Sequence, residues 1–388
     1  MQKSINKFHI FGSGFKAIYL ALSLKKKFHN SSITINTRNN FFGAYDYKVI
    51  SNLYLDYGCH LFSNNKKIKD CFELKKKEIN PIKLKYASVN NFGKTNGFSI
   101  YDFRNHTDIT KITKDFETNI FGKKNIVSNL QNFFTNIYGK KITKIIDNFC
   151  KKMTGLRLMD LDHRSNEFLF FNRLLLYNTS KSLNLKKGIL EPILATPFRY
   201  NFDLSDGYIS FAFKNGNYGF VKKIHHLFKK YDINFSDNPA KSSKILDLRP
   251  KDMIYEKKMS IKIPLHLVYF LVEKYQYTFI HDYSDSPIFR ISSPGFYTHQ
   301  FIHQKKHSYI CIEVPDPEFK YDKNFLIKLS KKYIKTKKIQ FLEYLFLKQS
   351  YPTIYKKNYD ISNYSIVNPT LYSKDKIMNA IDNYLNLV

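Results

Sequence analysis

The sequence predicts an α/β fold in which a parallel sheet with its helices is interleaved with a helical insertion and an antiparallel sheet. Short apolar runs at residues 5–12 and 32–37 flank a helical stretch from residue 14 to about 28. This layout is typical of buried parallel strands around a helix. From about residue 66 to 205 the apolar spacing is mostly helical. Residues 260–315 instead carry period-two and β-branched runs, which favour an antiparallel sheet.

The first apolar run leads directly into a glycine-rich turn, in which Gly12, Ser13, Gly14 and Ala17 form a G-x-G-x-x-A motif. Gly12 allows a sharp turn, Gly14 lets the backbone approach a pyrophosphate, and the small Ala17 lets helix and strand pack closely. The free N–H groups and the dipole at the helix N-terminus favour such an anion. The motif therefore predicts a Rossmann-like, dinucleotide-binding unit.

Two later segments extend this motif. Gly43-Ala44 follows the second strand, and Tyr57-Gly58-Cys59-His60-Leu61-Phe62 comes next. Together with the first turn they resemble the flavoprotein superfamily of amine oxidases, protoporphyrinogen oxidases and UDP-galactopyranose mutases. In that family a Gly-Gly pair and a hydrophobic-Gly-x-His-x-Phe segment occupy these places, and Tyr57–Phe62 resembles the mutase form closely. The resemblance implies a Rossmann-like FAD/NAD(P)-binding domain with an interleaved substrate domain, and FAD as the cofactor.

The resemblance also assigns residues to the cofactor and to the substrate. Phe289-Arg290-Ile291 is similar to the Arg-containing strand of the mutases and related oxidases, and Ser350-Tyr351-Pro352 to their Tyr-Pro turn. It implies catalytic roles for His60 and Arg290 and substrate contacts from Arg290 and Tyr351. The residues expected to contact FAD are Gly12, Ser13, Gly14, Ala17, Thr37, Arg38, Gly43, Ala44, Gly58 and His60.

Three of these side chains also have a structural interpretation. A single His in an apolar run, such as His60, is otherwise a hydrogen-bonded core residue. Arg290 on a strand is either a salt-bridged arginine or, on a sheet facing a cavity, a bidentate ligand for a phosphate or carboxylate. Tyr351 either contacts the substrate or packs in its turn. The residue types alone leave both interpretations open.

Two departures from the family pattern support a second hypothesis. Thr37 stands where the family has a Glu or Asp that accepts hydrogen bonds from the ribose, and a hydroxyl brings no charge. No glycine follows Gly295, although the family carries a Gly-rich turn before its last helix. The alternative is therefore a degenerate family member that has lost FAD and serves as a binding or scaffold protein. A third hypothesis, an NAD-binding protein, uses the same first unit.

Composition bears on the partners. The 388 residues include 63 Lys and Arg against 32 Asp and Glu, a formal net charge of +31. Such a surplus suits nucleic acid, an anionic surface or a phosphate-bearing small molecule. The lysines are spread along the whole chain rather than gathered in one arm, so no specific nucleic-acid partner is expected. The favoured function is an FAD-dependent oxidoreductase for a small, anionic substrate such as a nucleotide sugar; nothing indicates the oligomeric state.

Several classes of site and location are not expected. Four cysteines lack paired spacing, which argues against a disulfide framework or a metal site and favours a reducing compartment. No run of 18 apolar residues exists, so no transmembrane segment is predicted. Residues 1–7 lead straight into the first strand and leave no room for a signal peptide, so a cytoplasmic protein is expected. Zinc-hydrolase, P-loop and serine-hydrolase motifs do not occur.

The predicted organisation is discontinuous. The FAD/NAD(P)-binding domain comprises residues 1–65, 206–260 and 340–388, the helical insertion residues 66–205, and the antiparallel-sheet substrate region residues 261–339. Residues 339–347 are ambiguous between helix and strand. The individual helices are expected at 126–138, 142–153, 168–176, 216–230, 323–335 and 374–387.

Overall fold

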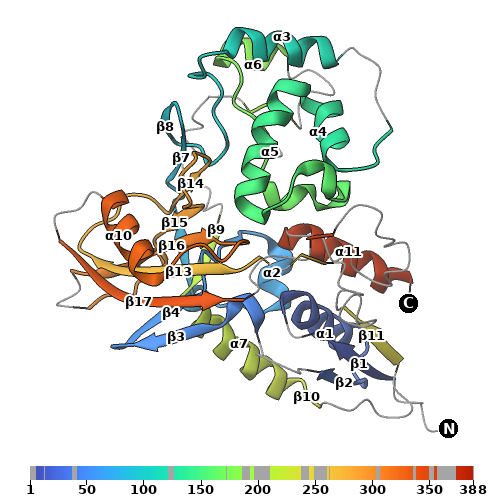
Figure 1. The fold of residues 1–388 in the computed structure, drawn as a ribbon. Helices are drawn as coiled ribbons and strands as arrows, with labels where there is room; N and C mark the ends of the chain where they lie inside the picture. The colour runs from blue at the N-terminus through green and yellow to red at the C-terminus, as the bar shows by residue number, and fades with distance from the viewer. Residues whose placement is uncertain are drawn as a thin grey trace.

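The computed structural model consists of a parallel α/β unit, a large mixed sheet and a helical region (Figure 1). Figure 1 shows the helices α3–α6 gathered at one end, the parallel sheet at the other, and the large sheet between them. The structure describes residues 6–12, 14–36, 42–120, 126–171, 173–185, 193–195, 210–236, 244–248, 260–261, 263–302, 306–334, 338–348, 354–355 and 373–387.

The parallel sheet has the strand order β10-β2-β1-β11, and every neighbouring pair is parallel. Its strands are β1 (Lys7–Phe11), β2 (Ser32–Asn36), β10 (Ile233–Phe235) and β11 (Lys244–Asp247). The order reverses at β1, because β2 lies on one side of it and β11 on the other. The predicted pair of parallel strands around a helix is confirmed, and β1 ends where open α/β sheets bind ligands.

Helix α1 (Phe15–Lys27) connects β1 and β2 and is largely buried. Ala17, Leu20, Ala21 and Leu24 recur at helical spacing and all lie in the core beneath it. Three lysines in the last turn interact favourably with the negative C-terminal end of the helix dipole. Two more helices complete this core, α7 (Gly216–Lys230) and α11 (Lys374–Leu387), and both match the predicted ranges.

The large sheet has the strand order β17-β13-β16-β15-β14-β7-β8. Its neighbouring strands are antiparallel except for the parallel pair β14 and β7. The strands β13 and β16 are buried along their whole length, and α10 (Lys323–Tyr333) packs against this sheet. The strands are β7 (Tyr86–Asn90), β8 (Gly93–Asn96), β13 (Leu265–Val272), β14 (Phe279–Asp282), β15 (Arg290–Ser292), β16 (Ser308–Pro315) and β17 (Ile339–Leu347).

The helical region is built around α3 (Ile109–Ile120), α4 (Leu130–Tyr138), α5 (Lys140–Thr154) and α6 (Thr179–Leu185). The expectation of a buried helix over residues 168–176 is wrong. A 3-10 helix, η4 (His163–Leu169), ends there, Phe170 has a φ of +61°, and Leu174 and Leu175 form isolated bridges to other segments. The apolar character of this stretch reflects its burial in the helical core rather than helical structure.

Short elements join the three parts. The hairpin of β3 (Tyr47–Ile50) and β4 (Leu53–Asp56) follows the short η1 (Gly43–Tyr45). A small sheet contains β5 (Phe62–Ser63), β9 (Ser210–Phe213) and β6 (Ile79–Ile82). The others are α2 (Lys66–Cys71), η2 (Lys76–Glu78), η3 (Leu158–Asp160), β12 (Ser260–Ile261), α9 (Pro294–Tyr297) and β18 (Ile354–Tyr355). The division of the chain into domains stays a prediction. The large sheet also contains β7, β8 and, apart from Ile339, β17, which lie outside residues 261–339.

Candidate functional site

Gly12 and Gly14, the two glycines of the predicted phosphate-binding motif, lie between β1 and α1. Gly12 has a φ of +128°, and a Cβ there would lie 3.7 Å from the Cβ of Leu248 and 3.8 Å from that of Ala17. Its N–H donates to the carbonyl of Asn36 at the end of β2, at 3.4 Å. Gly14 caps α1, and a Cβ on it would meet nothing within 4 Å. The backbone at the start of α1 is therefore open to a ligand.

This arrangement fits the pyrophosphate of a dinucleotide. The first turn of α1 contains no acidic residue, so nothing there opposes an anion. The buried Ala17 permits the close packing of helix and strand that the motif predicts. Ser13, Thr37, Arg38 and Tyr351 lie outside the described residues. Their predicted contacts, and those of the described glycines and Ala17, stay predictions.

The next predicted cofactor segment begins η1. Gly43 has a φ of +56°, and both Gly43 and Ala44 are exposed. Tyr45, the last residue of this turn, lies against the ring of His60, with 4.9 Å between the ring centres. The structure thus joins the Gly43–Tyr45 turn to the His60 segment.

The Gly58–His60 segment runs between β4 and β5 and packs onto the large sheet. Gly58 has a φ of +103°, and a Cβ on it would lie 3.2 Å from Oε1 of Glu313. Nε2 of His60 lies 3.0 Å from the carbonyl oxygen of Tyr57, so this nitrogen carries the proton and donates it. Burial lowers the pKa of His60 to about 3. His60 is therefore neutral near pH 7 and presents its lone pair at Nδ1.

Arg290 lies opposite Glu313 in the register of β15 and β16. Its Nε and Nη2 donate to the two carboxylate oxygens of Glu313 at 2.7 and 2.8 Å. Glu313 therefore links Arg290 to Gly58, and His60 follows two residues later, near enough for the Arg290 charge to help lower its pKa. These residues form one candidate site between the α/β unit and the large sheet. Nε and Nη2 of the Arg290 guanidinium thus bond a carboxylate of the protein itself.

Sequence reasoning missed several residues of this site. Lys374, the first residue of α11, donates to the carbonyl oxygen of Leu61, one residue after His60. The hydroxyl of Tyr297 contacts the Cys59 sulfur at 3.5 Å, and burial raises the pKa of that thiol. Glu313 could have been identified from the sequence, because an acidic residue within an apolar strand needs a buried partner. Lys374 had no such signal in the sequence.

A buried carboxyl group lies behind the site. Oδ1 of Asp56 accepts the backbone N–H of Asn217 at 2.7 Å, at the start of α7. Oδ2 has no hydrogen-bond partner among the described residues. Burial raises the pKa of Asp56 to about 8, so the group is mostly protonated near pH 7. The protonated, neutral Asp56 side chain thus joins the end of β4 to the start of α7 through its hydrogen bond from Asn217.

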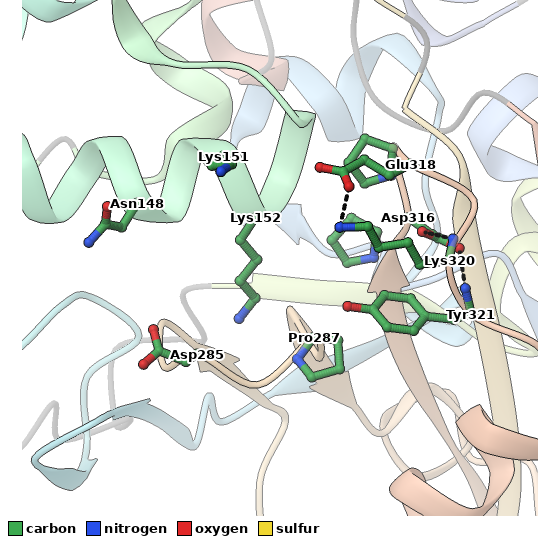
Figure 2. Close-up of a pocket in the computed structure, with 11 residues that line it drawn as sticks. Asn148, Lys151, Lys152, Asp285, Pro287, Asp316, Glu318, Lys320 and Tyr321 are labelled. Carbon is green, nitrogen blue, oxygen red and sulfur yellow. Dashed lines mark hydrogen bonds and ion pairs between the residues drawn. The ribbon is translucent and has the colours of Figure 1, made fainter.

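A separate cleft of about 320 Å³ lies between α5 and the segments that follow β14 and β16 (Figure 2). Lys152 reaches into it and donates to the carbonyl oxygens of Asp282 and Ser284 at 2.8 and 3.0 Å. Burial lowers the pKa of Lys152 to about 8. The other charged side chains include Asp285 and the Glu318–Lys320 pair, so the cleft has no single sign of charge. None of the described predicted site residues lines it.

Neither a candidate metal site nor a candidate membrane-spanning helix occurs in the described residues. They contain no group of three or more His, Cys, Asp or Glu side chains that could hold a metal ion. Within the same part of the chain, no helix is both long and apolar enough to cross a membrane. All four cysteines have free thiols.

A scan against protein-family models gives no match, and neither does a search of curated proteins. Solved structures do match. Reduced UDP-galactopyranose mutase superimposes with a TM-score of 0.62 at 12% identity, covering 90% of this chain and 83% of the mutase. Cyclohexylamine oxidase from Brevibacterium oxydans IH-35A gives a TM-score of 0.59 at 8% identity over 99% of both chains. An oxidoreductase from Methanosarcina mazei gives 0.53 at 11% identity over 89% of each chain.

Likeness at such low identity establishes the fold. It spans nearly the whole chain in each case, so the large sheet and the helical region match as well as the parallel α/β unit. The predicted fold class and the predicted resemblance are both confirmed by these matches. The chain is a divergent sequence with the fold of UDP-galactopyranose mutase and cyclohexylamine oxidase.

Proposed function

We propose that the protein is an FAD-dependent oxidoreductase that acts on a small, anionic substrate such as a nucleotide sugar. One observation carries this proposal: the start of α1 lies beside the segment that carries Gly58 and His60, and Gly58 packs on the Arg290–Glu313 pair. Phe15, the first residue of α1, contacts the ring of Phe62 at the end of that segment. A cofactor held at the start of α1 would extend toward that segment. When bound, FAD supplies the redox or nucleophilic chemistry.

The chain's own residues have defined tasks in this proposal. Gly12 and Gly14 let backbone N–H groups at the start of α1 hold the pyrophosphate. The missing side chain at Gly58 allows a close approach to Glu313. His60 stays neutral and positions the segment through its bond to the Tyr57 carbonyl, so it transfers no proton near pH 7. Arg290 orients Glu313 through two hydrogen bonds to its carboxylate.

The substrate class rests on charge and on one structural neighbour. A net charge of +31 creates a field that attracts anions. One protein with this fold is a mutase named for UDP-galactopyranose. We place the reaction in the cytoplasm, where reduced thiols such as the four described here persist.

The absorption spectrum of the purified protein tests the cofactor. We expect flavin bands between about 350 and 500 nm, either as purified or after addition of FAD and removal of the excess. Gly14→Val should abolish these bands without loss of stability, because a Cβ at Gly14 meets nothing and its backbone is extended. Thermal unfolding of both proteins supplies the control. A folded wild-type protein without bands and without FAD uptake would defeat the enzyme proposal.

The second candidate is a binding or scaffold protein that has lost FAD. Thr37, in place of an acidic ribose ligand, favours it. It predicts no flavin uptake by the wild-type protein and no effect of Gly14→Val on any ligand. Uptake of a nicotinamide dinucleotide without flavin would instead support the NAD-binding alternative.

A further inference from the structure

Lys374, at the start of α11, places a cation in the candidate site beside the Gly58–His60 segment. Its ammonium donates to the Leu61 carbonyl and lies 4.3 Å from the ring centre of Phe62 and 5.5 Å from that of Tyr45. We propose that the Lys374 ammonium binds an anionic oxygen of the substrate, from a phosphate or a carboxylate. This inference rests on the proposed oxidoreductase function and names the group that recognises the substrate's charge.

The hydrogen bonds of Lys374 leave capacity for a ligand. An ammonium group has three N–H donors, and among the described residues this one has a single acceptor, the Leu61 carbonyl. Lys374 forms no ion pair with any carboxylate of the described residues. Burial removes part of the hydration of this ammonium, and an anionic ligand would replace it with an opposite charge. The side chain is partly exposed and therefore accessible.

Arg290 is less suited to this role. Its Nε and Nη2 donate to both carboxylate oxygens of Glu313, which offsets its charge. A substrate anion would have to displace a buried carboxylate to occupy the same fork. Lys374 reaches the same site from α11, and no carboxylate among the described residues is paired with it there.

The titratable groups around Lys374 set the pH at which it acts. They are Cys59 and His60 beside it, Arg290 from the sheet and Asp375 on its own helix. Burial raises the pKa of Cys59 and lowers that of His60 to about 3, so both are neutral near pH 7. Asp375 accepts hydrogen bonds from Ser63 and Asn65. Burial lowers the pKa of Lys374 to about 8, so its charge is lost as pH rises through that value.

Calorimetric titration with UDP and with inorganic pyrophosphate tests this role. The proteins are the wild type, Lys374→Met, Lys374→Arg and, as a matched control, Lys376→Met two residues along the same helix, where the side chain is exposed. We expect Lys374→Met to weaken UDP binding at pH 7 by about tenfold or more, since a charged hydrogen bond is lost. Lys376→Met should bind within about twofold of the wild type, as surface charges at a distance are screened.

The pH profile separates recognition from a structural role. Wild-type affinity for UDP should fall between pH 7 and 9.5, whereas Lys374→Arg should keep it, because arginine remains charged. Thermal unfolding of Lys374→Met reports any general loss of structure. If folded Lys374→Met binds UDP as tightly as the wild type, or if the arginine variant shows the wild-type pH profile, the inference is wrong.

Two further arms distinguish the possible sources of the phosphate. Titration of FAD-loaded protein leaves only the substrate position for UDP, whereas pyrophosphate binding that disappears on loading and in Gly14→Val reports the cofactor position. The flavin spectrum is recorded for every variant. Lys374→Met with normal flavin and normal UDP binding overturns this inference alone. A wild type without flavin overturns the proposed function, whatever UDP does.

Discussion

Arg290 and Glu313 form a buried ion pair at the centre of the candidate site. Glu313 is only 1% exposed and accepts two hydrogen bonds from the arginine, at 2.7 and 2.8 Å. Removing one partner of such a pair leaves the other charge buried and uncompensated, which costs about 3–5 kcal/mol. We therefore expect Glu313→Gln to lower the free energy of unfolding by about 3 kcal/mol in urea denaturation at pH 7.

The double variant Arg290→Met/Glu313→Leu is the control for this prediction. It removes both charges and keeps similar volumes, so it should be less destabilised than Glu313→Gln alone. A single variant that loses under about 1 kcal/mol would show that solvent reaches the pair and screens it. Flavin binding in the double variant then tells whether the pair also supports the cofactor site.

Asp56 makes the stability of the protein depend on pH. Its pKa rises from 3.8 to about 8 on folding, because the carboxyl group is buried. Between these values the folded state holds a proton that the unfolded state has released, so this group's contribution to stability falls as pH rises. The slope from one proton is at most about 1.4 kcal/mol per pH unit. Asp56→Asn removes the titration and should flatten the curve between pH 4 and pH 8.

The measurement is the difference between the wild-type and Asp56→Asn free energies of unfolding at several pH values. Taking the difference removes the opposite effect of carboxylates whose pKa is lowered, such as Asp316 and Glu78. Two parallel curves across this window would contradict the assignment of Asp56 as a neutral acid.

The start of helix α7 depends on the absence of a side chain at Gly216. A Cβ there would lie 2.4 Å from Oδ1 of Asp56, and the residue has a φ of +63°. Gly93 is a matched control, because its φ is also positive, at +140°, but a Cβ on it would meet nothing within 4 Å. We expect Gly216→Ala to destabilise the protein by about 1–3 kcal/mol more than Gly93→Ala in thermal or urea unfolding. Equal losses would mean that Asp56 moves aside freely.

Elements with a strong local pattern could be predicted from the sequence. The β1–α1–β2 unit and helices α7 and α11 follow from short-range spacing, and the structure has them where they were expected. The helix predicted over residues 168–176 was wrong because the apolar side chains there fill a core shared by several helices. Periodicity alone cannot distinguish such a buried irregular segment from a buried helix. Residues 339–347 were ambiguous between helix and strand, and pairing with β13 makes them a strand.

The candidate site was only partly predictable, since its residues meet through long-range packing. Gly58 and His60 carried a sequence motif, but their neighbours Glu313 and Lys374 come from segments more than 250 residues further along the chain. No local pattern indicates that Glu313 lies against Gly58 or that the α11 start reaches Leu61. Arg290 could be placed on a strand, but its partner depends on the register of β15 and β16.

At the scale of the whole molecule, the net charge of +31 should attract any polyanion without selecting one. The described pairs, such as Lys67–Asp382 and Lys230–Glu73, engage part of the basic surface. Binding to DNA through phosphates alone falls by about 10³–10⁵ between 50 and 200 mM salt when 6–10 contacts form. We expect the protein to retain duplex and single-stranded DNA at low salt and to release both near physiological salt, without sequence preference. Fluorescence anisotropy over a salt series measures this, and tight binding that survives about 150 mM salt would make nucleic acid a partner.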